Sequence, residues 1–262
     1  MKIILHADDF GFDKNTTEAT IELLECNVLT SATIMANMPA TTLATQYASQ
    51  HPELSFGVHL TYVDGLKPCY KGASSLLDNN KLFLPSNDVR KRALILRLNK
   101  EDIIHESLAQ IQTLRMRGVK VSHIDSHGHL HKFPSFLLAL EDITKQSGIN
   151  KVRRVQNVFL KTPKTSTTTI LNGMFAAYIE KRFKTTKYFY MSANSMDTHW
   201  SDALLTQLDI LPSSAVIEVG VHPGTIMTGK EAWRAEEYRD IKLFAKKIRE
   251  SGKHQIITWN DL

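Results

Sequence analysis

Short apolar runs alternate with longer amphipathic segments along the chain. The apolar runs have the length of buried strands and predict strands at residues 2–7, 31–35, 54–60, 119–125, 151–155, 188–191, 215–221 and 255–258. The segments between them predict helices at residues 13–26, 39–49, 88–117, 134–146, 170–182, 203–208 and 230–251. This alternation of strand and helix favours parallel strands that are covered by helices.

Polar residues and glycine mark the ends of several predicted helices. Asp13 is placed to cap the first helix. The sequence Asn99-Lys100-Glu101 predicts a break within residues 88–117, and Gly118 is placed to end the second piece. Residues 62–87 are rich in Gly, Pro, Asn and Ser, which predicts an irregular segment.

The sequence shows no boundary between domains. It contains no composition shift, Ser/Gly tract or internal repeat, so we expect residues 1–262 to form a single α/β domain. The strand count fits a distorted (β/α) TIM-type barrel with seven or eight mostly parallel strands better than an open doubly wound sheet. Periodicity alone does not separate these two folds.

The composition is that of a soluble globular protein, with 42% hydrophobic and 23% charged residues. No apolar run approaches the ~20 residues of a membrane span, and the first residues are too few and too acidic for a secretory signal. The two cysteines, Cys26 and Cys69, argue against a disulfide framework or a cysteine-rich zinc site. We therefore expect a cytoplasmic, reduced protein that has no membrane partner.

Positive charge is in excess, with a formal net charge of +5, but it is scattered along the chain. Basic pairs occur at residues 91–92, 153–154, 181–182 and 246–247, and none belongs to a long run interleaved with aromatic residues. With no nucleic-acid-binding motif present, we expect no nucleic-acid partner. A homodimer is expected only because closed two-fold dimers are the commonest oligomers.

Histidines are concentrated in residues 123–131. Four of the eleven histidines and one aspartate occupy the odd positions there, namely His123, Asp125, His127, His129 and His131. In an extended backbone this spacing would point all five side chains to the same side, and Ser126, Gly128 and Pro134 predict that the chain then turns. Imidazole and carboxylate groups that leave a strand end together are typical ligands of a divalent metal ion, and a solvated polar loop is the alternative.

Other candidate groups stand at the carboxyl ends of other predicted strands. Asp8 and Asp9 end the first strand, His59 lies at the end of the third, and His222 follows the strand at 215–221. Because sites in parallel α/β folds form at this edge, we expect these groups to converge. One carboxylate of the aspartate pair could bind a metal while the other accepts a proton, and His222 could protonate a leaving group.

Each of these residues also has an ordinary structural explanation. The two aspartates could complement a helix dipole, His59 could be a buried histidine bonded to backbone, and His222 could belong to a turn. Arg154 could orient a carboxylate or bind a substrate oxygen, or it could form a structural ion pair. The gathering of so many donors on one edge favours a functional site, because chance would scatter them between both ends.

Four short motifs hold the candidate residues. In chain order they are Ala7-Asp8-Asp9-Phe10-Gly11, Gly57-Val58-His59-Leu60, His123-Ile124-Asp125-Ser126-His127 and Val221-His222-Pro223-Gly224. In their order and spacing, from near residue 2 to about residue 225, they resemble the YdjC-like carbohydrate deacetylases, the group that includes chitooligosaccharide deacetylase. The resemblance implies a distorted TIM-type barrel and metal-dependent removal of an acetyl group from an N-acetylated sugar.

The resemblance also implies a role for each matching residue. The residues are Asp9, His59 and His127 as metal ligands, Asp8 as general base and His222 as general acid. The resemblance selects His127 from the four histidines of residues 123–131, which spacing alone cannot do. The implied ion is Mg²⁺, although two histidines would suit Zn²⁺ equally well.

Some questions stay open at this level. The chain departs from the family pattern at Arg153-Arg154, so either arginine could reach the site. The sugar, and whether it carries a phosphate, are not specified. A metal-dependent sugar-phosphate phosphoesterase could use the same ligands, and an inactive sugar-binding protein is a third reading, against which the presence of all five residues counts.

Overall fold

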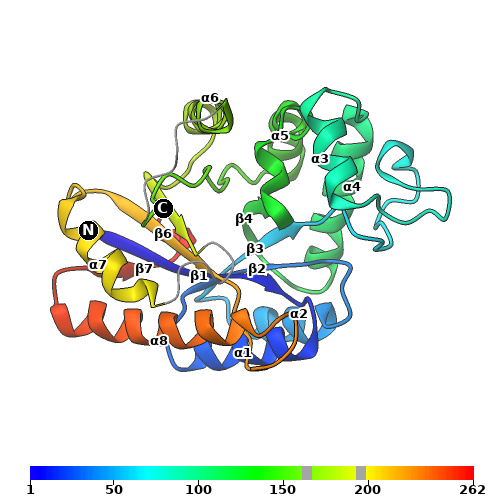
Figure 1. Ribbon diagram of the computed structural model, residues 1–262. Helices are drawn as coiled ribbons and strands as arrows, with labels where there is room; N and C mark the ends of the chain where they lie inside the picture. The colour runs from blue at the N-terminus through cyan, green and yellow to red at the C-terminus, as the bar shows by residue number, and fades with distance from the viewer. Residues whose placement is uncertain (161–166, 193–198) are drawn as a thin grey trace.

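In the residues that the computed structural model describes, 1–160, 167–192 and 199–262, seven parallel strands form a curled sheet surrounded by helices (Figure 1). The strands are β1 (Lys2–Phe10), β2 (Ser31–Ile34), β3 (Ser55–Leu60), β4 (Val121–Ser126), β5 (Tyr188–Met191), β6 (Val216–Val221) and β7 (Gln255–Ile257). These strands lie close to their predicted ranges. They read as nearly continuous apolar runs because helices cover a parallel sheet.

Strand β1 is central in the sheet, whose strand order is β4-β3-β2-β1-β6-β5, with β7 also paired to β1. β6 pairs along one edge of β1. The other edge is shared, because β7 pairs with residues 2–4 of β1 and β2 pairs with residues 6–10. Every residue of β1 after Lys2 is buried. The strand that ends in the two aspartates is therefore held on both edges.

Helices cover the outside of the sheet. They are α1 (Lys14–Glu25), α2 (Thr41–Gln50), α3 (Ser86–Leu94), α4 (Lys100–Met116), α5 (Pro134–Ser147), α6 (Thr167–Arg182), α7 (Trp200–Ile210) and α8 (Trp233–Ser251). Figure 1 shows α1, α2 and α8 along one side of the sheet and α3, α4 and α5 grouped beside β3 and β4. Across the described ranges, none of the helices is both long enough and apolar enough for a membrane span.

Two predicted helix boundaries are confirmed by hydrogen bonds. The side chain of Asp13 accepts a hydrogen bond from the backbone N–H of Thr16 and caps α1. The side chain of Asn99 accepts one from the N–H of Glu101, which places the expected break between α3 and α4. In both helices the side chain satisfies an N–H that has no partner within the helix.

The predicted strand at residues 151–155 is wrong. Only isolated bridges join this segment to its neighbours, such as the one between Val152 and Ile124 of β4. Backbone hydrogen bonds farther along connect it to β5, so it fills the gap between β4 and β5 without forming a ladder. One reason is that the side chain of Arg154 donates to backbone carbonyls just before β5, which a ladder would need as acceptors. The barrel is distorted here, and the predicted fold class is confirmed.

Candidate functional site

Strand β1 has a β-bulge, one extra residue relative to β2, at its two aspartates, Asp8 and Asp9. Its pairing with β2 shifts between Ala7–Ala32 and Phe10–Ile34, so three steps along β1 oppose two along β2. Asp9 has a φ of 58°, in the left-handed region that aspartate tolerates better than most residues. Both carboxylates are consequently buried at the carboxyl end of the central strand, each residue with 1% of its surface exposed.

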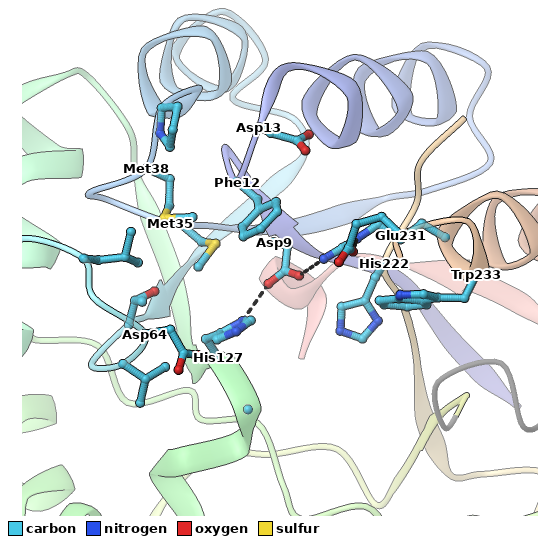
Figure 2. Close-up of a pocket in the computed structure, with 16 residues that line it drawn as sticks. Asp9, Phe12, Asp13, Met35, Met38, Asp64, His127, His222, Glu231 and Trp233 are labelled. Atoms are coloured by element: carbon cyan, nitrogen blue, oxygen red, sulfur yellow. Dashed lines mark hydrogen bonds and ion pairs between the residues drawn. The ribbon is translucent and has the colours of Figure 1, made fainter. Parts of the chain in front are cut away.

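Asp9 meets two histidines from neighbouring strands, and Figure 2 shows its contact with His127. Its Oδ1 lies 3.2 Å from Nε2 of His59, in β3, and 2.9 Å from Nδ1 of His127, which follows β4. Ligand atoms of the three residues lie within 4.8 Å of one another. One carboxylate and two imidazoles are a donor set that fits a divalent cation with positions left for water and substrate. The structure thus brings together the three predicted metal ligands.

His59 is oriented by Asp125 of β4. Nδ1 of His59 lies 2.7 Å from Oδ1 of Asp125, which leaves Nε2 for Asp9. Burial alone would lower the pKa of this imidazole. The charge of Asp125 and hydrogen bonds to Asp125 and Asp9 outweigh burial and raise the pKa of His59 to about 10. In the metal-free protein His59 is therefore a buried imidazolium between two carboxylates.

Asp8 belongs to a buried cluster of charges around Arg153. Nη1 of Arg153 lies 2.8 Å from Oδ2 of Asp8 and 2.5 Å from Oδ2 of Asp125, and its Nη2 lies 2.7 Å from Oε1 of Glu218. Burial raises the pKa of Asp8, against the opposing charge of Arg153. Burial likewise raises the pKa of Glu218, to about 7. Arg153 is thus the arginine that reaches the site, whereas Arg154 donates to backbone carbonyls elsewhere.

His222 follows β6 and is held by a carboxylate of α8. Glu237 Oε2 accepts hydrogen bonds from the backbone N–H of His222 at 2.6 Å and from its Nδ1 at 3.2 Å. This pairing places a proton on Nδ1 and leaves Nε2, which lies 3.9 Å from Oδ2 of Asp8. Burial alone would lower the pKa of His222, but the hydrogen bond and charge of Glu237 raise it. Sequence reasoning selected His222 and missed Glu237.

A cavity of about 680 Å³ opens onto Asp9, His127 and His222. Figure 2 shows Asp64 and His127 on one side of Asp9, and His222 and Trp233 on the other. The rings of His222 and Trp233 meet edge to face, with their centroids 5.3 Å apart. The predicted irregular segment, residues 62–87, contributes to the wall. The cavity therefore joins two of the candidate metal ligands, Asp9 and His127, and the candidate acid His222 in one space.

The histidine-rich stretch does not stay extended, so its side chains do not all point to the site. Asp125 and His127 reach it, but Gly128 and His129 adopt left-handed conformations with φ of 61° and 54°. The chain turns there, and Nδ1 of His131 instead lies 2.8 Å from a serine hydroxyl. The expectation of a common direction is therefore wrong for His129 and His131. His123 stacks on Trp259, with ring centroids 4.4 Å apart, and is a core residue.

Comparison with curated proteins gives relatives named for one activity. Residues 2–244 match the model of the YdjC-like protein family. Proteins named carbohydrate deacetylase from Halalkalibacterium halodurans and Vibrio cholerae are each 34% identical to this chain, over 151 and 146 residues. Each alignment covers 56% of this chain, and the two cover 61% and 56% of the relatives' own lengths.

Comparison with solved structures shows the same fold. A protein from Enterococcus faecalis V583, named for a proposed role in cellobiose-phosphate cleavage, superposes with a TM-score of 0.79 over 99% of this chain and 98% of its own, at 22% identity. The catalytic domain of a peptidoglycan N-acetylglucosamine deacetylase from Eubacterium rectale superposes with a TM-score of 0.50 at 12% identity, covering 98% of this chain and 87% of its own. Because the family match runs from β1 into α8 and includes every site residue described above, the chain belongs to the YdjC-like protein family.

Proposed function

We propose that this protein is a metal-dependent deacetylase that hydrolyses the N-acetyl group of an amino sugar or short oligosaccharide and releases acetate. The observation that carries the proposal is the buried metal-ligand set beside a second carboxylate, Asp8, and a histidine, His222. Asp9, His127 and His222 line one cavity. Relatives named carbohydrate deacetylase support it over the aligned part of the chain.

A divalent cation held by Asp9, His59 and His127 would polarise the acetamido carbonyl and make a water molecule more acidic. These ligands supply nitrogen and oxygen donors without sulfur. Mg²⁺ is our first choice of ion because the family resemblance implies it. Zn²⁺ is the second, because imidazole ligands suit zinc.

Asp8 and His222 would divide the proton transfers. Arg153 holds Oδ2 of Asp8, while Oδ1 makes no hydrogen bond within the described ranges. The raised pKa of Asp8 favours its action as a proton acceptor, because a base works best when its pKa approaches the working pH. His222, whose pKa Glu237 raises, would donate a proton to the departing amine.

The cavity fits a sugar of one or two rings. Its volume of about 680 Å³ lies within the usual range for small-molecule sites. Trp233 offers an aromatic face beside His222 on which a sugar ring could pack. On the other side, residues 62–87 form a wall that is tied to α4, where the carboxylate of Glu106 accepts hydrogen bonds from two backbone N–H groups of this segment.

Acetate release tests the proposed function. The protein is stripped of metal, supplied with Mg²⁺ or Zn²⁺, and incubated with N-acetylglucosamine, its disaccharide or their 6-phosphates. We expect acetate from at least one sugar only after metal is restored. Phosphate release without acetate would support the phosphoesterase alternative, and tight sugar binding without either product would support a binding protein.

Metal affinity is expected to rise with pH. A cation binds neutral imidazole, so it must displace the proton that the metal-free protein keeps on His59 up to a pKa of about 10. Below that pH the apparent association constant should rise about tenfold per pH unit and one proton should leave. Calorimetry in two buffers of different ionisation enthalpy measures both quantities.

The matched variant for this experiment is Asp125→Asn. It removes the charge that holds the proton on His59, so the pH dependence of metal affinity should become flatter. A wild-type affinity that is independent of pH, with no proton released, would contradict the protonation of His59 in the metal-free protein.

A further inference from the structure

Arg234 of α8 binds the oxygen of Asp9 that faces away from the two histidines. Its Nη2 lies 2.7 Å from Oδ2 of Asp9. The other oxygen, Oδ1, is the one that approaches His59 and His127. The two oxygens of this carboxylate therefore have different partners, a guanidinium on one and the histidine pair on the other.

The guanidinium of Arg234 is fixed on several sides. Its Nε donates to Glu231 at 2.7 Å, and its Cζ lies 5.2 Å from the ring centroid of Phe12 and 4.7 Å from that of Trp233. The residue is 6% exposed. A Cβ added at Gly224 would lie 2.9 Å from Cβ of Arg234, so the adjacent loop packs closely against the base of this side chain. A side chain held so firmly can determine how its carboxylate partner is oriented.

We propose that Arg234 is a positioning residue that limits Asp9 to a single metal-ligating oxygen. Carboxylates bind cations through one or both oxygens. With Oδ2 held by the guanidinium, only Oδ1 is presented to the cation, and the position that Oδ2 would take stays open for water or substrate. This inference rests on the proposed metal site and adds a residue that controls its open position.

Cobalt(II) is a suitable probe, because its visible absorption weakens as the number of ligands increases. The variants are Arg234→Met, which removes the charge and the donors, and Arg234→Lys, which restores a cationic donor. Arg239→Met is the control, since Arg239 is exposed in the same helix and does not line the cavity of the candidate site. Each protein is titrated with Co²⁺, its absorption spectrum is recorded, and its kcat and KM for the best sugar are measured.

We expect Arg234→Met to bind Co²⁺ with affinity near that of the wild type, but with a weaker visible absorption from the added oxygen ligand. Its kcat should fall about 10- to 100-fold with little change in KM. Arg234→Lys should recover part of both properties, and Arg239→Met should match the wild type.

Two results would overturn the proposal. A wild-type spectrum and kcat in Arg234→Met would show that Asp9 needs no such partner. Loss of Co²⁺ binding in a folded Arg234→Met would show that Arg234 is needed for the metal site to form at all. Its role would then not be to orient the carboxylate of Asp9. The spectrum does not depend on the reaction, so a protein that binds Co²⁺ but releases no acetate would refute the proposed function and leave this test intact.

Discussion

Asp8→Asn should lower the turnover of an N-acetylated sugar by about 10²- to 10⁴-fold, the usual contribution of a general base. Asparagine cannot accept the proton, but its carbonyl oxygen can still receive the hydrogen bond from Arg153. Metal binding should persist, because Asp9, His59 and His127 supply the ligands. Acetate release gives the turnover, and calorimetry with the same ion gives the affinity.

The matched control is Asp13→Asn. Asp13 lines the cavity onto which Asp9 and His222 open, and it caps α1. Asparagine is an equally good helix cap. This variant should retain turnover, because Asp13 makes no contact with the proposed metal ligands in the described part of the chain. If Asp8→Asn lost metal binding and turnover to the same extent, the division of roles between Asp8 and Asp9 would be wrong.

Arg153→Met should cause the largest loss of stability. Arg153 is fully buried and pairs with the carboxylates of Asp8, Asp125 and Glu218. Removing one partner from such a cluster leaves buried charge uncompensated, which costs about 3–5 kcal/mol of unfolding free energy. Denaturant unfolding of the metal-free protein at pH 8 measures this loss.

The loss should shrink in acid. Burial already raises the pKa values of Asp8 and Glu218, and loss of the guanidinium would raise them further, so the folded form of the variant binds more protons as the pH falls. Protonation therefore stabilises the folded variant at pH 5 relative to pH 8. Arg239→Met, on the surface, should cost at most about 0.5 kcal/mol. An equal cost for both variants would contradict the role of Arg153.

If Arg153→Met does not fold, Glu218→Gln tests the same cluster from its other side. The pKa of Glu218 is raised to about 7, so the wild-type carboxyl group is partly protonated at neutral pH. Glutamine resembles the protonated form, and its carbonyl can still accept from Arg153. We therefore expect a small change in stability near pH 7, and a cost as large as that expected for Arg153→Met would contradict this account.

The sequence was sufficient to predict most of the fold because buried strands and capped helices leave local signals. The caps at Asp13 and Asn99 depend on the residues that immediately follow them, so they could be predicted from short motifs. The segment at 151–155 has a strand-like composition, but whether it forms a ladder depends on acceptors contributed from just before β5. Such a long-range competition for hydrogen bonds has no local signature.

The residues of the candidate site that could be predicted from the sequence are those at the carboxyl ends of predicted strands. The roles of Arg234 and Glu237 were missed because these residues lie in the helix predicted at residues 230–251 and not at the end of a strand. A signal was nevertheless present: both residues continue the buried stripe of Ile241, Phe244 and Ile248 toward the start of the helix. Charged residues on the apolar face of a helix need partners, and here the partners are Asp9 and His222.

The left-handed backbone at Asp9 limits which side chains evolution or a designer can place there. Glycine would suit the φ of 58° and lose the carboxylate, whereas β-branched residues would suffer steric strain. Glutamate keeps the charge, but it would carry the carboxylate one methylene farther on a backbone that favours Asp and Asn. Asparagine alone shares both the shape of the side chain and the tolerance of the backbone. Position 9 is therefore restricted both by its left-handed backbone and by the need for a carboxylate. Asp9→Asn removes the carboxylate and keeps a residue that tolerates this backbone, so it tests the chemical requirement alone.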